Sequence, residues 1–377
     1  MNRKIASHYA LVGGRLSRNI VVEVDDSRQI VAIDEVDTLD NRHGVEFYPG
    51  ILIPGMVNAH CHLELSYLRG AIAEGGGFAT FAREIGRVRG NYTLEERISA
   101  ASRADAQMWE EGVEAVLDIA NDEVAMGVKR ASKIEYTTLF ELFGLNTTTL
   151  ENHLMMAQQN KQSSITPHST YSLQSQIFLD ACKGNTSTIS VHLLESPDET
   201  RLYHNEGSLW EWYSRMGWEC DFLHYGSPAR RVAESIAGER RVVVVHGCEA
   251  TKEDVALLSD HFANNITWAL CPESNRYISS LRPPVEMLRE MGANIAIGSD
   301  SLASSRSLSI IENLRQLGDI PLEELLSWAT INGARAIGMA ERIGSIELGK
   351  RPGLAVIEGV DLHNLRLTEE SRSHRIL

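Results

Sequence analysis

Two histidines separated by one residue give the sequence its clearest chemical feature. His60 and His62 close an apolar run that is predicted to be a strand. Side chains of a strand alternate between its two faces, so both imidazoles lie on one face and suit two ligands of one metal ion. Alone, the His-x-His spacing is a weak motif, because two ordinary polar residues give it equally well. The motif indicates a metal site only if further ligands lie elsewhere in the chain.

Two later residues complete a ligand set for a catalytic ion. His192 and Asp300 each lie at the end of another apolar run, and with His60 and His62 they give three imidazoles and one carboxylate. We expect one divalent ion with an open position for water; zinc is favoured, and iron fits the same ligands. Such an ion lowers the pKa of a bound water to about 7, which makes hydroxide available as a nucleophile at neutral pH.

Three residues near these ligands suit acid–base chemistry. Glu195 follows His192 by three positions and is placed to protonate a substrate atom that gains electron density. His246 is placed to orient the water or to stabilise a developing oxyanion, and Asp300 to pass a proton to the leaving group. The alternative for Glu195 is a solvated carboxylate in the loop after a strand.

The elements that must position these residues read as repeated βα units. Short apolar runs rich in β-branched residues alternate with stretches of helical spacing, such as Thr93–Glu111 and Thr251–Phe262. Eight such units predict an α/β fold, a (β/α)8 TIM-type barrel, in which catalytic residues sit at the carboxyl ends of the strands. Five of the eight runs end in a candidate residue. The runs are 51–62, 112–120, 137–144, 164–169, 188–195, 241–247, 266–274 and 294–301.

Both chain termini read as short strands outside the barrel. Residues 1–50 and 341–377 are predicted to pair as a small β-sandwich domain, and residues 51–340 to form the metal-dependent hydrolase barrel. The polar tail after Val360 is expected to be poorly ordered.

Composition excludes some partners. Lys and Arg number 36 and Asp and Glu 51, so the net charge is −15, which disfavours nucleic acid and anionic membranes as partners. Five scattered cysteines indicate no disulfide framework, and no apolar run is long enough to be a signal peptide or a membrane span. We expect a cytoplasmic protein with a small-molecule substrate; a homo-oligomer stays open.

Longer motifs around the same residues resemble the amidohydrolase superfamily along nearly the whole chain. PGMVNAHCHLE (54–64) resembles its first-strand signature. VHLLE (191–195), VVHG (244–247) and IGSDSLASS (297–305) resemble the later markers of its adenosine-type and S-adenosylhomocysteine-type deaminase branch, and TPHSTYS (166–172) resembles the fourth-strand element whose histidine contacts substrate. The nearest motif match is to the cluster that contains aminodeoxyfutalosine deaminases.

The resemblance implies several further assignments. Binuclear members carry a carboxylated lysine on the fourth strand; this chain has no lysine there, which favours a single ion. Substrate binding is implied for His168, Glu64 and Ser304, and for one arginine of the group Arg83, Arg87 and Arg89, which would meet a substrate carboxylate. The zinc deaminases of the cytidine type are excluded, because their Pro-Cys-x-x-Cys motif is absent.

The residues and the resemblance together predict hydrolytic deamination of an amino-substituted purine, as nucleoside or free base, by attack of a metal-bound hydroxide. The substrate would be similar to aminodeoxyfutalosine, S-adenosylhomocysteine or adenosine. Two alternatives stay open: hydrolysis of a cyclic amide or a chloro-s-triazine on the same scaffold, and a catalytically inactive barrel. The inactive barrel predicts lost ligands, and the expected ligands are all present.

Overall fold

Parallel strands form the centre of the molecule. The computed structural model describes residues 2–39, 44–145, 150–161, 163–185 and 187–377. Strands β6 (Met56–Cys61), β7 (Val113–Ala120), β8 (Glu135–Leu142) and β9 (Ser163–Pro167) form one parallel sheet in that order. A second parallel sheet has the order β10 (Ile189–Leu193), β11 (Val242–His246), β12 (Ile266–Leu270) and β13 (Ile295–Ile297).

The two sheets meet at their carboxyl ends. An isolated parallel bridge joins Cys61 to Asp300, and another joins Ser169 to His192. The eight expected βα strands are therefore present, but a continuous hydrogen-bonded ladder around a closed barrel is not found among the described residues. Both bridges lie beside candidate site residues, so the sheets are held together where the chemistry is expected.

Both faces of the parallel strands are buried. Val243 and Val245 of β11 belong to one apolar cluster, together with residues of β6 and β7 and the helix α14 (Gly333–Ala336). The alternate residues Val242 and Val244 belong to a second, larger cluster that includes the helices of the outer layer. Burial on both faces explains why these strands read as continuous apolar runs in the sequence.

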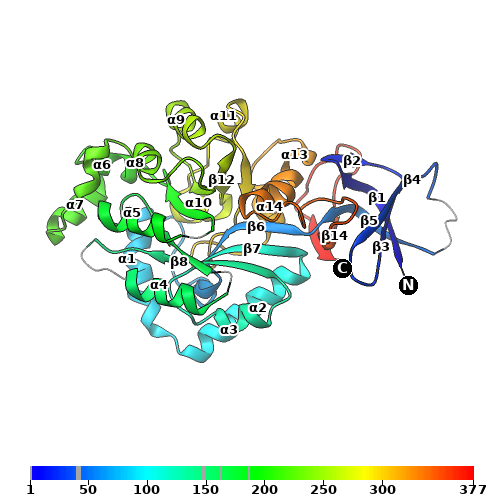
Figure 1. Ribbon diagram of the computed structural model, residues 1–377, viewed down its shortest axis with the longest axis horizontal. Coiled ribbons are helices and arrows are strands. Elements are labelled where there is room, and N and C mark those ends of the chain that lie inside the picture. Colours follow the sequence, from blue (N-terminus) through cyan, green and yellow to red (C-terminus); the bar gives the residue numbers. More distant parts are fainter. Residues whose placement is uncertain (1, 40–43, 146–149, 162, 186) are drawn as a thin grey trace.

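Helices surround the parallel strands (Figure 1). Threonines cap two of them: Thr93 accepts a hydrogen bond from the backbone of Glu96 at 3.2 Å, and Thr251 does the same for Asp254 at 3.2 Å. No helix in the described part of the chain has the length and apolar character that a bilayer span requires. The α-helices of the outer layer are α1 (Phe78–Val88), α2 (Leu94–Glu110), α3 (Met126–Ala131), α4 (Leu150–Gln159), α5 (Ser175–Gly184), α6 (Pro197–Tyr203), α7 (Gly207–Met216), α8 (Pro228–Ser235), α9 (Lys252–Phe262), α10 (Pro272–Ser279), α11 (Val285–Glu290), α12 (Ile310–Arg315) and α13 (Leu322–Ser327).

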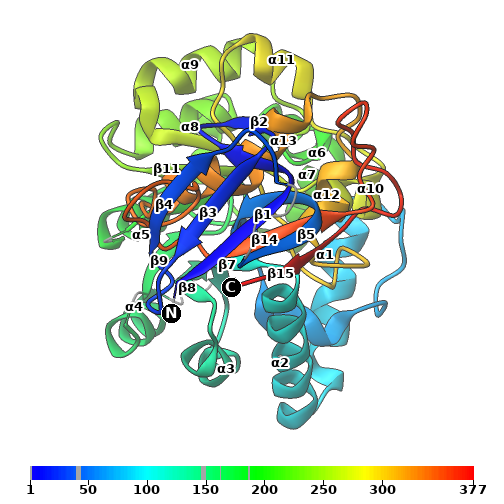
Figure 2. The ribbon, with the colours of Figure 1, turned by 90° about the vertical axis from the view of Figure 1, so that its right-hand side faces the viewer.

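The terminal segments form a single seven-stranded sheet, seen face-on in Figure 2, and not the expected sandwich. A second sheet packed against it is not found in the ranges that the structure describes. Its members are β1 (Arg3–Val12), β2 (Arg15–Ser17), β3 (Ile20–Val24), β4 (Ile30–Glu35), β5 (Val45–Pro54), β14 (Leu354–Glu358) and β15 (Arg372–Arg375).

The first predicted run, 51–62, is divided between two sheets. β5 ends at Pro54 in the terminal sheet, and β6 begins at Met56 in the parallel sheet. Gly55 lies between them and donates its backbone N–H to the carbonyl of Pro352 at 3.0 Å. A Cβ atom at this position would lie 2.5 Å from that carbonyl oxygen, so a larger residue does not fit.

The tail after Val360 is not poorly ordered, which corrects the expectation from its polar composition. β15 pairs antiparallel with β14, and Arg375 donates hydrogen bonds to the carboxylate of Glu114 and to the carbonyls of Trp109 and Val113. Its guanidinium also lies over the Trp109 ring. One arginine thus fastens the chain end to the start of β7, which the polar sequence around it did not indicate.

Candidate active site

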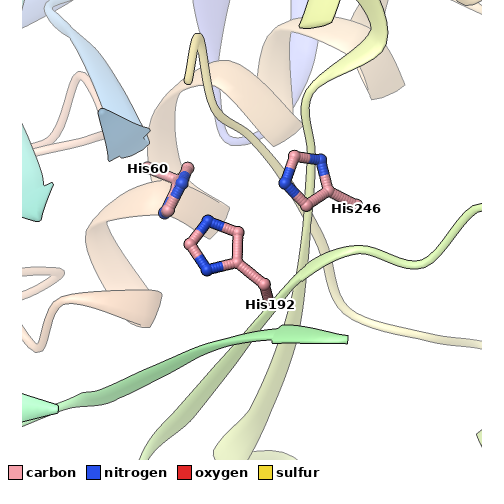
Figure 3. Close-up of side chains that lie close together, drawn as sticks. All are labelled: His60, His192 and His246. Atoms are coloured by element: carbon pink, nitrogen blue, oxygen red, sulfur yellow. The ribbon is translucent and has the colours of Figure 1, made fainter. Parts of the chain in front are cut away.

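The candidate residues come together at the carboxyl ends of the parallel strands. His60 and His192 lie on β6 and β10, and His246 ends β11; Figure 3 shows the three rings turned toward one another. The ring centroids are 4.8 Å apart for His60 and His192 and 5.2 Å apart for His192 and His246. Asp300 follows β13 and Glu195 follows β10.

His60, His62 and Asp300 form one group that suits a metal ion. Oδ1 of Asp300 lies 3.7 Å from Nε2 of His60 and 3.6 Å from Nε2 of His62. Both ring nitrogens of His60 are buried, and neither has a hydrogen-bond partner. Buried polar atoms are normally paired, so these orphaned nitrogens fit ligands of a divalent cation.

His192 lies in a second group, which shares His60. Ligand atoms of His60, His192 and His246 all lie within 4.8 Å of one another. Nδ1 of His192 is 2.9 Å from the carbonyl oxygen of His168, which makes Nδ1 the protonated nitrogen and leaves the Nε2 lone pair available. The four predicted ligands are therefore all close to His60, although they are divided between two groups.

Burial keeps three of the site's imidazoles neutral, whereas Asp300 is charged. Burial lowers the pKa of His62, His168 and His246 to about 4, so each imidazole is neutral at pH 7 and has a lone pair to offer. Burial alone would raise the pKa of Asp300, but in the acid range, where the neighbouring imidazoles are protonated, their charges outweigh burial and hold that pKa well below its usual range. The group is thus prepared for a cation before one binds.

Two serines orient Asp300. The hydroxyls of Ser274 and Ser304 both donate to Oδ2, at 2.5 and 2.8 Å, which leaves Oδ1 toward the histidines. The backbone of Asp300 has φ +56°, a left-handed conformation that costs energy for a residue with a side chain. The strained turn and the serines together aim one oxygen at the candidate metal position.

Glu195 and His246 form an acid–base pair beside these ligands. Oε1 of Glu195 lies 3.6 Å from Nε2 of His246. Burial raises the pKa of Glu195 well above its usual range, and the charges of Asp300 and Glu199 raise it further. The Asn275 amide lies 3.0 Å from Nδ1 of His246 and donates to it, so the ring proton is on Nε2, which faces Glu195. A protonated carboxyl and an N–H donor therefore meet at one point.

A cavity of about 480 Å³ opens onto this point. Its polar floor contains most of the predicted residues: His62, His168, His192, Glu195, His246 and Asp300. Aromatic side chains of α1 and α7 and their neighbours also line it and include Phe78, Phe81, Trp212, Tyr213 and Trp218. A flat, largely apolar ligand with a few polar groups matches such a surface.

Comparison with known proteins agrees with this geometry. The sequence model of the amidohydrolase family matches residues 51–374 of this chain. The chain belongs to this family.

Similar proteins include several deaminases. The chain is 26% identical over 333 residues to an adenosine deaminase of Helicobacter pylori, with 82% of this chain and 79% of that protein covered. It is 24% identical over 394 residues to a 5-methylthioadenosine/S-adenosylhomocysteine deaminase of Haloarcula marismortui, with 95% and 84% covered. Among solved structures, H. pylori aminofutalosine deaminase in complex with methylthio-coformycin has a TM-score of 0.81 at 25% identity, with 94% and 92% covered.

Two residues of this amidohydrolase that were expected to bind substrate do not line the cavity. Ser304 is fully buried behind Asp300 and donates to it. Glu64 is also buried; its Oε2 accepts the backbone N–H of Asp122 at 3.1 Å, and burial raises its pKa to about 8. Glu64 lies beside the cavity residue Arg89, whose Nη2 is 3.8 Å from Oε1 of Glu64.

The three candidate arginines are placed differently. Arg89 lines the cavity. Arg83 and Arg87 are exposed on α1, and Arg87 is paired with Glu84 at 2.6 Å. Arg89 is therefore the candidate that can meet a charged group of a ligand in this cavity.

Several residues that line the cavity or hold the candidate residues were not singled out from the sequence. Glu141 is the next-to-last residue of β8 and lines the cavity; its Oε1 lies 3.9 Å from Nδ1 of His62 and accepts from Asn121 at 2.9 Å, and its Oε2 has no hydrogen-bond partner. It lies inside the predicted run 137–144, three residues before the end of that run, so the strand-end signal that found the histidines did not single it out. Ser274 and Asn275 lie on the helix α10, because β12 ends at Leu270, four residues before the end of the predicted run 266–274.

Proposed function

We propose that this amidohydrolase is a metal-dependent hydrolytic deaminase of purine nucleosides. The observation that carries the proposal is that His60, His62, His192 and Asp300 lie together, with the pair Glu195–His246 beside them, at one cavity. Similarity to adenosine, 5-methylthioadenosine/S-adenosylhomocysteine and aminofutalosine deaminases supports removal of an amino group from a purine. The chain thus acts as a hydrolase on C–N bonds.

His60, His62, His192 and Asp300 would hold the ion. Three imidazoles and one carboxylate suit zinc, and the same donors bind ferrous iron. When bound, the ion makes water acidic enough to act as a nucleophile near neutral pH. Ser274 and Ser304 orient Asp300 for this task, and the His168 carbonyl fixes the tautomer of His192.

The protein's own residues move three protons. Glu195, protonated because its pKa is raised, donates to the ring nitrogen beside the carbon under attack. The attacking water loses one proton to Asp300, which passes it to the departing amino group, and ammonia leaves. The second water proton returns to Glu195, so the enzyme is restored and the product is a lactam. His246 donates its Nε2–H to the oxygen that gains charge in the transition state.

The cavity also indicates how a nucleoside is held. His168, Glu141 and Asn121 line its polar side, and hydroxyl groups of a sugar suit these acceptors and donors. The aromatic side chains that line the cavity accommodate a substituent beyond the sugar, and Arg89 is the cation within reach of a charged one. This arrangement favours an adenine nucleoside that carries a substituent over a free base.

The architecture belongs to the same proposal. We infer that both parallel sheets form one closed (β/α)8 wall, since the bridges Cys61–Asp300 and Ser169–His192 connect them at both junctions. We also infer that residues 51–340 make up the catalytic unit and that residues 1–50 and 341–377 contribute the small β-domain. The turn at Gly55 supports a first boundary a few residues later than residue 51, because β5 stays in the terminal sheet up to Pro54 and β6 begins in the parallel sheet at Met56.

An assay of ammonia release tests the function. Metal-loaded protein would be incubated with adenosine, 5-methylthioadenosine, S-adenosylhomocysteine and aminodeoxyfutalosine, with Asp300→Ala as the control for a contaminating deaminase. We expect ammonia from at least one nucleoside with the wild type and at least about 10²-fold less with the variant, the scale of a lost catalytic group. Absence of ammonia release from all four nucleosides, or equal rates of release for wild type and variant, contradicts the proposal.

A further inference from the structure

Glu199 is a fully buried carboxyl that the mechanism above does not use. It lies on α6, one helical turn after Glu195, and its exposed fraction is 0%. Burying a carboxyl costs several kcal/mol unless the group is well hydrogen-bonded, so such a residue has specific partners. Those partners lie on the turn that carries Glu195 and on the loop that follows β9.

The first contact is to the backbone of the catalytic turn. Oε2 of Glu199 accepts the backbone N–H of Glu195 at 3.1 Å, and the Glu199 carboxylate also accepts from the N–H of Leu194. Leu194 has φ +52°, a left-handed conformation that is strained for a branched side chain. Because this strained residue directs the next one into the cavity, the carboxylate stabilises the conformation that aims Glu195.

The second contact anchors Glu199 to the opposite loop. The hydroxyl of Thr170 donates to Oε1 of Glu199. The carbonyl of Thr170 in turn accepts from Nη1 of Arg231 at 2.6 Å and from the hydroxyl of Tyr203 at 2.8 Å. Arg231 is fully buried and also donates to the carbonyl of Leu173 at 2.9 Å.

Aromatic rings complete this anchor. The guanidinium of Arg231 lies 4.5 Å from the ring centroid of Phe178 and 4.4 Å from that of Phe222. The loop held in this way begins with His168, which lines the cavity. A chain of buried contacts therefore connects the loop after β9, through Glu199, to the turn of Glu195.

We propose that Glu199 is a positioning residue that holds the backbone of Leu194 and Glu195 so that the Glu195 carboxyl reaches the substrate ring nitrogen. The inference rests on the proposed function, in which Glu195 transfers that proton. Glu199 does not line the cavity and touches no reacting atom. Its effect is on geometry, and displacement of a catalytic group by about 1 Å can lower a rate about 10²-fold.

A pair of substitutions separates hydrogen bonding from mere filling of space. Glu199→Met has a similar length and no acceptor, so two buried N–H groups lose their partner. Glu199→Gln keeps an oxygen for those N–H groups, while the Thr170 hydroxyl can reverse and accept from the amide. Thr170→Val removes the anchor alone and is informative even if Glu199→Met does not fold. Glu114→Met, at the start of β7, is the matched control for loss of a half-buried carboxylate far from the cavity.

Metal-loaded proteins would be compared by kcat, KM, metal content and hydrogen exchange of the backbone amides of Leu194 and Glu195. For Glu199→Met we expect kcat to fall 10- to 100-fold, with metal content and KM within about two-fold of wild type and exchange at least about ten-fold faster. Glu199→Gln should lose less than about five-fold in kcat, Thr170→Val about three-fold or more, and Glu114→Met should leave kcat unchanged.

Wild-type kcat in Glu199→Met, or unchanged amide exchange in that variant, overturns the inference. If Glu199→Met does not fold, wild-type kcat in Thr170→Val overturns it. Equal losses of kcat in Glu199→Gln and Glu199→Met would also contradict it, because the acceptor oxygen would then be irrelevant. Failure of the proposed function is distinguishable: the wild-type enzyme would release no ammonia from any nucleoside, whereas the exchange measurement would still report the contact of Glu199 with the turn.

Discussion

Two buried carboxyls at the ends of parallel strands have opposite properties. The imidazoles around Asp300 hold its pKa well below the usual range, so it is charged and suited to a cation. Burial, with two nearby carboxylates, raises the pKa of Glu195, so it keeps its proton at neutral pH. Where the pKa values of two carboxyl groups are driven apart, the group with the low pKa serves as metal ligand or base, and the group with the high pKa serves as acid.

Substitution of Glu195 and of Asp300 tests proton donation and metal binding separately. Glu195→Gln should keep metal bound and lower kcat about 10²-fold or more, because the amide cannot donate the proton. Asp300→Ala should lower metal content and kcat together, because it removes a ligand. Elemental analysis and steady-state kinetics on both variants check this division. Near-normal turnover in Glu195→Gln removes Glu195 from the mechanism, and full metal occupancy in Asp300→Ala removes Asp300 from the ligand set.

A second prediction concerns the pH dependence of stability. Burial raises the pKa of Glu199 from 4.5 to about 7, so between these values the folded protein binds a proton that the unfolded chain has lost. The free energy of unfolding should therefore fall as pH rises from about 4.5 to about 7, by about 3 kcal/mol from this residue. Glu199→Gln has no titrating carboxyl at this position, so in denaturant unfolding the free energy of unfolding of wild type minus that of the variant should fall by about 3 kcal/mol as pH rises through this range. A constant difference would show that Glu199 titrates normally.

At the scale of elements, the sequence predicts which strand ends bring candidate residues together. His60, His192 and His246 could be recognised because strand ends are visible as the ends of apolar runs, and the carboxyl ends of parallel strands lie at one edge. The same reasoning failed for the termini. A polar tail that pairs with β14 through backbone hydrogen bonds, and is held by Arg375, has no apolar pattern to reveal it.

Residues that support the site from other elements were beyond prediction for a physical reason. Asn275 reaches His246 from α10, and Glu199 reaches Leu194 and Glu195 from α6, through contacts that depend on how helices pack on strands. Residue type and spacing do not encode that packing. Ser304 illustrates the same limit, because its motif was visible but its partner, the outer oxygen of Asp300, was not.

The attachment of β15 yields a prediction at this scale. Arg375→Ala should lower the free energy of unfolding by about 2 kcal/mol, because it leaves the half-buried Glu114 without its cation, and part of the cost of a buried unpaired charge applies. KM and kcat should not change, since the strand end is remote from the cavity. Arg372→Ala is the control: Arg372 is exposed and bonds only nearby carbonyls, so a change within about 0.5 kcal/mol is expected. Equal losses in denaturant unfolding would contradict the role of Arg375.

At the scale of the whole molecule, the metal should connect both parallel sheets. The candidate ligands come from β6 in one sheet and from β10 and the end of β13 in the other. A ligand that binds only the folded state stabilises it by mass action. Removal of the ion with a chelator should therefore lower Tm as well as activity, and added zinc should restore both. A chelated protein with unchanged Tm and lost activity would show that the ion does not link the sheets.

Hydrolysis at a purine carbon is the central claim for this molecule, and isotope incorporation measures it most directly. The enzyme would turn over its nucleoside in water enriched in oxygen-18, and product and ammonia would be quantified by mass spectrometry. We predict one solvent oxygen in each product, on the carbon that lost the amino group, and one ammonia per product with the sugar still attached. Product without solvent oxygen on that carbon, or release of a free base without ammonia, would contradict deamination at this site.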